Sequence, residues 1–259
     1  MPTSAGPFPL FVRRPDPDRV GWLPGHEYAH RGLHGCVDGV RVVENSLAAF
    51  ALAIERNMGI ECDIQRSRDG EAMLLHDWEL DRLTGVSGQT DSYDAAELAR
   101  IAFINSDHRI ARLSDLLDLV AGRVPILIEI KSRARYDVKR SCAAVARSLQ
   151  GYRGAVAVMS FDPRVSRWFA RHYPAPVRGL VMKETPDGPT PRPWQRRLAL
   201  AHARPEFLAY DIRALPNRLV AAVKARGVPL ATWTVNTPER RARALIHADA
   251  LICEGEGLA

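Results

Sequence analysis

Residues 59–76, GIECDIQRSRDGEAMLLH, contain two apolar runs that flank a short polar turn. Parallel neighbouring strands need a crossover of a dozen or more residues, and this turn is far shorter. Residues 59–66 and 72–76 are therefore predicted to form an antiparallel hairpin. If the turn centres near Asp69, residue i lies opposite roughly residue 138 − i.

Two acidic side chains, Glu61 and Asp63, alternate with apolar residues in the first of these strands. Alternate side chains of a strand share a face, so both carboxylates project the same way. Like charges held that close raise each other's pKa, and a cation between them relieves the repulsion. The hairpin register sets His76 across from Cys62, so an imidazole is expected beside both carboxylates. The pattern therefore predicts a metal site, but by itself it does not indicate which reaction takes place there.

Short apolar segments alternate with helical patterns along most of the chain. The predicted strands are residues 27–31, 59–66, 72–76, 124–131, 155–160, 178–182, 207–212, 229–235 and 250–253. Asn45 or Ser46 can cap one of the intervening helices, and Ser114 can cap another. Once the extra hairpin strand is set aside, the other eight fit an α/β fold, a distorted (β/α)8 TIM barrel with a parallel sheet.

The barrel is predicted to occupy residues 26–259 as one domain. Residues 1–25 carry six prolines and no apolar block, which indicates a loosely draped N-terminal arm and no signal peptide. Residues 78–110 are too long for a plain loop and are interpreted as a small insertion above the barrel mouth. No apolar run approaches the ~20 residues of a transmembrane helix, so a cytoplasmic location is expected.

The composition is that of an ordinary globular protein with a basic surface. The 259 residues are 46% hydrophobic and 25% charged, with a formal net charge of +6. The cations are almost all arginines spread along the chain, without a basic block interleaved with aromatic residues, so no nucleic-acid partner is predicted. An anionic small-molecule substrate or a transient contact with a membrane surface fits the same charge. The four cysteines lack the spacing of a zinc site and are expected to be reduced and mostly buried.

A second charged strand end lies in residues 126–132, ILIEIKS, where Glu129 and Lys131 share a face. Charges in a strand of otherwise apolar residues are costly unless they are paired or bound to something. In a barrel, the C-terminal ends of the strands form the active-site face. His30 and Arg31 end the first strand, so they should converge there with this pair and with the hairpin carboxylates. Three carboxylates and no sulfur favour a hard, oxygen-seeking cation over zinc.

Seven motifs resemble those of the glycerophosphodiester phosphodiesterase family in order and spacing, over roughly residues 26–255. They are His30-Arg31-Gly32, VENSLAAF at 43–50, Glu61-Cys62-Asp63, His76-Asp77, Ile128-Glu129-Ile130-Lys131, Ser160-Phe161 and Trp233-Thr234-Val235-Asn236. The resemblance implies a barrel of the phospholipase C-like phosphodiesterase type with a divalent cation, Mg²⁺ or Ca²⁺. It implies hydrolysis of glycerophosphodiesters to glycerol 3-phosphate and an alcohol.

The resemblance also implies a role for each matching residue at the centre of the site. Glu61, Asp63 and Glu129 would ligate the cation, while His30 and His76 would serve as the acid/base pair. Which histidine is the acid stays open, as does the choice between water and a glycerol hydroxyl as the nucleophile.

Further matching residues would contact the substrate. Arg31 and Lys131 would hold the phosphate, and Glu44 would contact the substrate or the water around the cation. Phe161 and Trp233 would either line the alcohol pocket or pack the barrel interior, and the sequence does not favour one role over the other.

Three neighbouring features are less specific. Asp77 could orient a histidine or cap the turn, and the turn is favoured. His34 recurs four residues after His30, but the glycines around them argue against a helical metal-binding face, and His34 is interpreted as a surface loop residue. Glu254 stands where the family usually has aspartate, so its longer reach should alter substrate fit.

Two rival functions remain. A lysophospholipase D would act on lipid at a membrane surface, although no long amphipathic apolar helix supports it. A non-catalytic phosphodiester-binding module is disfavoured because both histidines, all three carboxylates and both phosphate-facing cations are present. The oligomeric state and the alcohol stay open.

Overall fold

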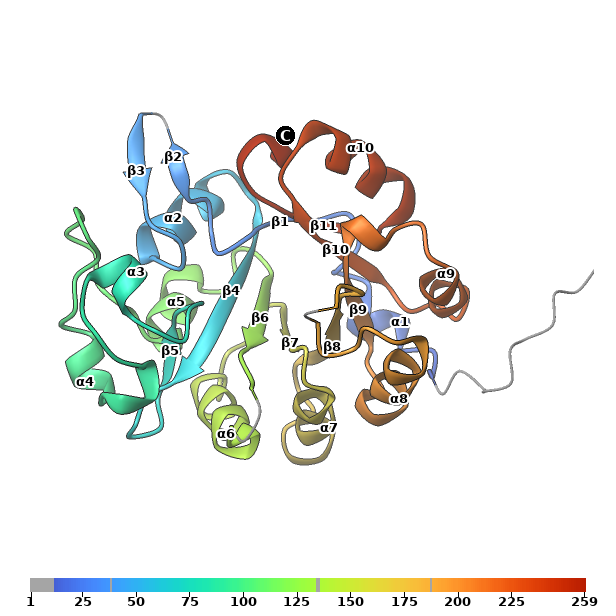
Figure 1. The fold of residues 1–259 in the computed structure, drawn as a ribbon, viewed down its shortest axis with the longest axis horizontal. Coiled ribbons are helices and arrows are strands. Elements are labelled where there is room, and N and C mark those ends of the chain that lie inside the picture. The colour runs from blue at the N-terminus through green and yellow to red at the C-terminus, as the bar shows by residue number, and fades with distance from the viewer. Residues whose placement is uncertain (1–11, 38, 134–135, 187) are drawn as a thin grey trace, which may run out of the picture.

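The computed structural model describes residues 12–259 apart from residues 38, 134–135 and 187. Eight parallel strands close into a barrel in the order β1-β11-β10-β9-β8-β7-β6-β4, and β4 pairs back with β1 (Figure 1). The barrel strands are β1 Glu27–Ala29, β4 Gly59–Arg66, β6 Ile126–Ile130, β7 Val156–Met159, β8 Val177–Met182, β9 Phe207–Asp211, β10 Leu230–Val235 and β11 Ala250–Cys253. The predicted (β/α)8 barrel is confirmed.

Helices surround the barrel and connect its strands (Figure 1). The longer ones are α2 Leu47–Glu55, α5 Leu113–Val120, α6 Val138–Ser148, α7 Pro163–His172, α8 Pro193–Ala203, α9 Arg218–Lys224 and α10 Pro238–His247. Short helices are α1 Pro17–Val20, α3 Asp81–Thr84, α4 Ala95–Leu98 and the 3-10 turns η1 Thr90–Ser92, η2 Ile212–Ala214 and η3 Gly255–Gly257. Among the described residues, no helix combines the length and the apolar composition needed to cross a membrane.

The hairpin has the register expected from its turn. β5, Ala72–Leu74, runs antiparallel to β4, with Ile64 opposite Leu74 and Arg66 opposite Ala72. Both pairs obey the predicted relation between residue i and residue 138 − i. The backbone thus returns toward the C-terminal half of β4 and delivers His76 to the barrel mouth.

Side-chain alternation in β4 decides what faces the barrel interior. Ile60, Cys62 and Ile64 belong to the core between the barrel and its helices, together with Phe50 of α2. The intervening residues, Glu61 and Asp63, therefore point to the interior, and both are buried. The same alternation in β6 turns Leu127 and Glu129 inward.

The segment before β1 closes the other end of the barrel. Val20 and Leu23 are buried in the interior cluster that contains Tyr28, Leu127 and Phe207. Residues 16–25 are therefore not a loosely draped arm, because their apolar side chains fill the floor of the barrel. Residues 1–11, also assigned to that arm, lie outside the described residues.

The long connection after β5 has a small core of its own. Leu80, Ala95, Leu98 and Phe103 pack with Met73 of β5 in one cluster. Ala95 and Leu98 belong to α4, which lies within this connection. The helices of this segment, α3 and α4, lie on the β5 side of the barrel (Figure 1), so the inserted segment 78–110 is anchored on the hairpin strand.

Several local predictions can be compared with the structure. Ser46 caps α2 by accepting a hydrogen bond from the Ala49 N–H, as expected. Ser114 does not cap α5, because that helix already begins at Leu113.

A hairpin of β2 Gly35–Val37 and β3 Val40–Val42 was not predicted. All four cysteines are free, and Cys36, on β2, is the exposed one.

Candidate active site

Three carboxylates meet at the C-terminal ends of β4 and β6. Asp63 and Glu129 are direct partners in the register of the two strands, and Glu61 precedes Asp63 on the same face. Each of the three offers an oxygen atom, and these atoms lie within 4.8 Å of one another. Their side chains are almost fully buried, so water does little to screen their mutual repulsion.

The three acids differ in how their charge is balanced. The pKa of Glu61 is raised well above its usual value by burial and by the charges of Asp63 and Glu129. Burial also acts to raise the pKa of Asp63, but the charges of Lys131, His76 and Arg31 outweigh it, and the pKa falls. The Lys131 Nζ donates to Glu129 Oε1 at 3.0 Å and to Asp63 Oδ1 at 3.3 Å. Glu61 is therefore the acid whose charge is least compensated by the protein.

The turn after β1 brings backbone and side chain of Arg31 to this cluster. The Arg31 N–H donates to Glu61 Oε2 at 3.0 Å, and its guanidinium Nε lies 3.4 Å from Asp63 Oδ2. Arg31 has a φ of 57° and Gly32 a φ of 77°. A Cβ on Gly32 would lie 2.8 Å from the Ala49 Cβ, so glycine allows this turn to pack against α2.

Glu44 is engaged by two arginines. Its Oε1 accepts from Arg31 Nη1 at 2.9 Å and from Arg82 Nη2 at 2.6 Å. Burial opposes ionisation of Glu44, but the arginines more than offset it, and its pKa is lowered. Arg82, on α3 of the inserted segment, also contacts Asp77. Glu44 thus fixes the Arg31 guanidinium and links it to the insertion.

Asn45 holds Asp63 from both sides. Its Nδ2 donates to Asp63 Oδ2 at 3.1 Å, and its Oδ1 accepts the Asp63 N–H at 3.0 Å. The residue is fully buried and has a φ of 53°, a conformation that asparagine tolerates better than most residues. From the sequence, Asn45 was predicted only as a possible helix cap. The signal that could have placed it in the site is its position directly between Glu44 and Ser46.

Each histidine expected in the site has a carboxylate on its Nδ1. The Nδ1 of His30 lies 2.6 Å from Glu254 Oε2, and the Nδ1 of His76 lies 2.7 Å from Asp77 Oδ1. The prediction that Asp77 serves mainly as a turn residue is therefore wrong. Nε2 of His30 lies 4.0 Å from Glu61 Oε2, so this ring reaches from Glu254 to the carboxylate cluster.

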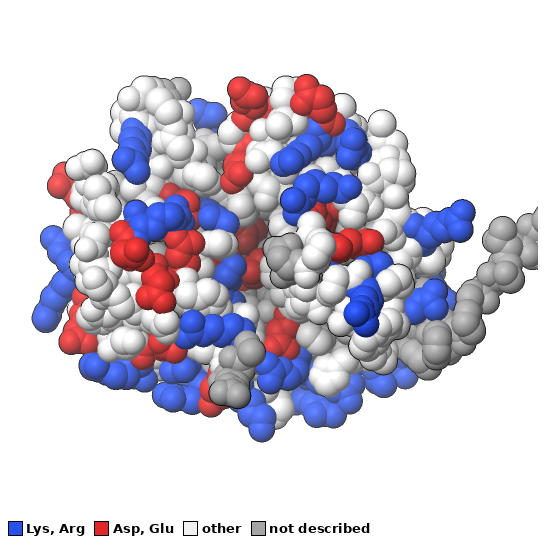
Figure 2. Space-filling view, viewed as in Figure 1, with Lys and Arg blue, Asp and Glu red and all other residues white. Residues whose placement is uncertain are grey.

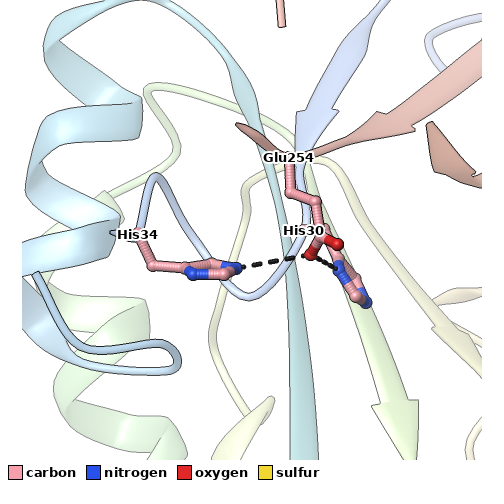
Figure 3. A group of neighbouring side chains, drawn as sticks. All are labelled: His30, His34 and Glu254. Carbon is pink, nitrogen blue, oxygen red and sulfur yellow. Dashed lines mark hydrogen bonds and ion pairs between the residues drawn. The ribbon is translucent and has the colours of Figure 1, made fainter. Parts of the chain in front are cut away.

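His34 belongs to the same group (Figure 3). Its Nε2 lies 3.5 Å from Glu254 Oε2, so one carboxylate oxygen stands between two imidazoles. Burial acts to raise the pKa of Glu254, yet the hydrogen bond with His30 and the nearby His34 imidazole lower it overall. His34 lies in a loop, as expected, but its side chain is only 21% exposed and its ring faces Glu254.

Two cavities open at this end of the barrel, where Figure 2 shows a hollow with acidic atoms at its bottom. One, of about 580 Å³, is lined by Glu129, Lys131 and Phe161 among others. The other, of about 390 Å³, is lined by His30, Arg31 and Trp233 among others. The Phe161 and Trp233 rings pack edge to face, 5.4 Å between centroids. The aromatic pair therefore stands between the two cavities and is part of their walls.

The donor set fits a hard divalent cation. Oxygen ligands from carboxylates are those that Mg²⁺ and Ca²⁺ prefer, and all three acids are close enough to share one ion. The uncompensated charge of Glu61 is a second observation in favour, since a cation beside it would relieve the repulsion that raises its pKa. His30, His34 and Glu254 also lie close together, but their contacts with one another already account for them.

Comparison with known proteins connects this geometry to a family. The model of the glycerophosphoryl diester phosphodiesterase family matches residues 30–253. Glycerophosphodiester phosphodiesterase of Caldanaerobacter subterraneus subsp. tengcongensis is 28% identical over 226 residues, which cover 84% of this chain and 88% of that protein.

Solved structures give the same fold. An Oleispira antarctica phosphodiesterase, in complex with its product sn-glycerol-3-phosphate, has a TM-score of 0.76 at 22% identity, covering 91% of this chain and 94% of that one. Glycerophosphodiester phosphodiesterase of Thermotoga maritima has a TM-score of 0.70 at 23% identity, covering 88% of this chain and 94% of that one. Since the family model spans most of the sequence, the protein belongs to the glycerophosphoryl diester phosphodiesterase family and is a phosphoric diester hydrolase.

Proposed function

We propose that this protein hydrolyses glycerophosphodiesters to glycerol 3-phosphate and an alcohol, with a divalent cation held by Glu61, Asp63 and Glu129. The observation that carries the proposal is the buried cluster of these three carboxylates, whose oxygen atoms lie within 4.8 Å of one another. Family membership supports the substrate class, and a relative's complex with sn-glycerol-3-phosphate supports that product.

The cation would be Mg²⁺ or Ca²⁺. When bound, such an ion neutralises charge on a phosphoryl oxygen and helps to orient the phosphodiester. The protein contributes a rigid cradle, because Asn45 and the strand register hold Asp63, while the Arg31 N–H holds Glu61. A cradle whose oxygens are fixed before binding needs little reorganisation during the reaction.

Arg31 and Lys131 would bind the phosphate. Both lie at the carboxylate cluster, and both keep their charge: Glu44 and Asp63 raise the pKa of Arg31 against the effect of burial, as Glu129 and Asp63 do for Lys131. With the cation and a singly charged diester in place, the formal charges of the three acids and these two cations cancel. Phosphoryl transfer chiefly requires in-line positioning and cations where charge accumulates.

His30 and His76 would exchange the protons. With Nδ1–H donated to Glu254 or Asp77, Nε2 of each ring is left as the atom that accepts a proton from the nucleophile or, when protonated, donates one to the departing alkoxide. The carboxylates hold each ring in one tautomer. Either ring can start as the base in this arrangement. Glu44 acts through Arg31, which it fixes by a hydrogen bond.

Phe161 and Trp233 would bind the organic parts of the substrate. The cavity beside Phe161 and the one beside Trp233 lie on two sides of the aromatic pair. A diester has two organic arms, and the two cavities suit one arm each. The apolar ring faces would pack against carbon atoms while the charged residues hold the phosphate.

A product panel tests the assignment. Glycerophosphocholine, glycerophosphoethanolamine and glycerophosphoglycerol are incubated with the protein and Mg²⁺ or Ca²⁺, and glycerol 3-phosphate and the alcohol are both quantified. We expect equal amounts of the two products from at least one diester. Release of phosphocholine or phosphoethanolamine instead would contradict it, because the other P–O bond would then be the one cleaved.

The same panel distinguishes the lysophospholipase D alternative. Lysophosphatidylcholine is added as micelles beside soluble glycerophosphocholine. Trp194 and Leu198, four residues apart on α8, are half exposed or more and are the side chains that would contact such a lipid. Preference for the soluble diester is expected, and preference for the lipid, reduced by Trp194→Ala, would support the alternative.

A further inference from the structure

An arginine-lined cavity lies at the opposite end of the barrel from the carboxylates. Its volume is about 460 Å³. Arg178 lies at the start of β8 and Glu206 directly precedes β9, so both are at the N-terminal ends of their strands. The arginines that line it are Arg13, Arg14, Arg167, Arg171, Arg178 and Arg204. This cavity is separate from the proposed active site.

The two acids of the lining do not balance this charge. Glu206 accepts from Arg19 Nε and from Arg178 Nε, each at 2.9 Å. Asp16 accepts the Asp18 N–H at 3.0 Å and caps α1. In the described part of the chain, the remaining lining arginines take part in no ion pair; they are Arg13, Arg14, Arg167, Arg171 and Arg204.

Helix ends account for only part of the arrangement. Arg171 lies in the last turn of α7 and Arg204 is the C-cap residue of α8, and cations are favourable at such positions. Arg13, Arg14 and Arg167 have no such explanation. The charges of Arg171 and, less strongly, Arg204 lower the pKa of Arg167, so the arginines repel one another. Residues 1–11 contain no acidic side chain that could neutralise them.

We propose that this cavity binds a small anion with two or more phosphate groups, at a site distinct from the catalytic centre. Guanidinium groups match phosphate oxygens in geometry and keep their charge at any physiological pH. No aromatic side chain is among the residues that line the cavity in the described part of the chain, so nothing there would stack a nucleobase. The recognised chemistry is therefore the phosphate groups themselves.

Calorimetric titration of the metal-free protein with sodium tripolyphosphate tests the site. The wild type should bind one equivalent saturably, more weakly as salt is added. Arg167→Gln combined with Arg171→Gln should weaken binding by about tenfold or more, because two charge-assisted contacts are lost. Diester hydrolysis by this variant should be unchanged, which also shows that it folds.

The matched control is Arg226→Gln combined with Arg243→Gln, two exposed arginines outside the cavity. This pair removes the same formal charge and should leave tripolyphosphate binding within about twofold of the wild type, since long-range charge is screened. Equal weakening in both double variants would overturn the proposal, as would unaltered binding in the cavity variant or no saturable binding by the wild type.

A vesicle arm identifies the source of the phosphate groups. Phosphatidylcholine vesicles with and without phosphatidylinositol bisphosphate are sedimented with the wild type and the cavity variant. Sedimentation that needs both the anionic lipid and the two arginines would support a lipid headgroup as ligand. Tripolyphosphate binding without such sedimentation would support a soluble anion.

Discussion

Glu254 Oε2 lies 2.6 Å from Nδ1 of His30, although 224 residues separate them in the chain. β1 and β11 are parallel neighbours in the barrel, with Ala29 paired to Cys253, so the residues that follow them meet at the mouth. The Asp77 carboxylate contacts Nδ1 of His76 in the same way, although these two residues are adjacent in the chain. The two histidines thus share one arrangement, in which a carboxylate fixes the ring and leaves Nε2 for proton transfer.

Replacing Glu254 tests that arrangement. Glu254→Gln keeps an oxygen that can accept the Nδ1–H but removes the negative charge beside the His30 ring. We predict a fall in kcat of about tenfold to 100-fold with little change in KM, the range typical of groups that orient a functional histidine. Steady-state kinetics on a soluble diester measure it. Glu254→Asp restores the charge and should recover part of the loss; a Gln variant with wild-type kcat would count against the role.

The histidines themselves should matter more. His30→Ala and His76→Ala each remove a general acid or base, and we predict that kcat falls by about 100-fold to 10,000-fold. Circular dichroism should be unchanged, because both rings lie at the mouth and outside the buried apolar clusters. His172→Ala is the control, since that exposed histidine lies on α7 and should leave kcat unchanged. Near-normal turnover in either site variant would reject the acid/base pair.

Asn45 holds Asp63 in the site and is also expected to contribute to the free energy of unfolding. In Asn45→Ala the buried Asp63 N–H loses its partner and alanine must adopt a φ of 53°. We predict a loss of about 2–4 kcal/mol in the free energy of unfolding, measured by urea denaturation. Asn45→Gly loses the same hydrogen bonds without the backbone penalty, so it should be less destabilised. If alanine and glycine were equally stable, the backbone part of this explanation would be wrong.

Glu61 gives a prediction about pH. Because its pKa is raised on folding, the ionised form destabilises the metal-free protein at pH values above that pKa, and the cost disappears as pH falls toward the ordinary value of 4.5. In chelator at neutral pH, Glu61→Gln should therefore unfold at a higher temperature than the wild type, with the difference shrinking in acid. A variant less stable than the wild type at neutral pH would contradict the repulsion.

A cation should reverse that order. Mg²⁺ or Ca²⁺ at a hundredfold excess over its dissociation constant should stabilise the wild type by about 2.7 kcal/mol, because only the folded state binds it. Glu61→Gln has lost one ligand and should gain less. Differential scanning calorimetry with and without the ion measures both effects, and an equal gain in the two proteins would exclude Glu61 as a ligand.

Local patterns were enough to predict the barrel and the carboxylate cluster. The five-residue turn at 67–71 determined the hairpin register, and the alternation of apolar and acidic residues in 59–66 determined which side chains face inward. Both are properties of a few consecutive residues. The same alternation predicted that Glu129 would join them from β6.

Contacts between distant segments were harder to predict. Arg82 reaches Glu44 only because the inserted segment packs on β5, and Glu254 reaches His30 only because the barrel closes. The cap of α5 was predicted two residues too late, at Ser114 instead of Arg112, since serine is also acceptable inside a first turn. β2 and β3 are short and mostly exposed, and the signal that could have predicted them is the Asp-Gly dipeptide at residues 38–39, which is typical of two-residue hairpin turns.

Release of glycerol 3-phosphate in the presence of chelator, followed by addition of Mg²⁺ or Ca²⁺, tests the central claim most directly. Three buried carboxylates that share one ion predict that activity disappears in chelator, returns with one equivalent of cation, and does not return when Glu61, Asp63 and Glu129 are replaced by their amides. Undiminished release of glycerol 3-phosphate by thoroughly chelated protein would contradict the account.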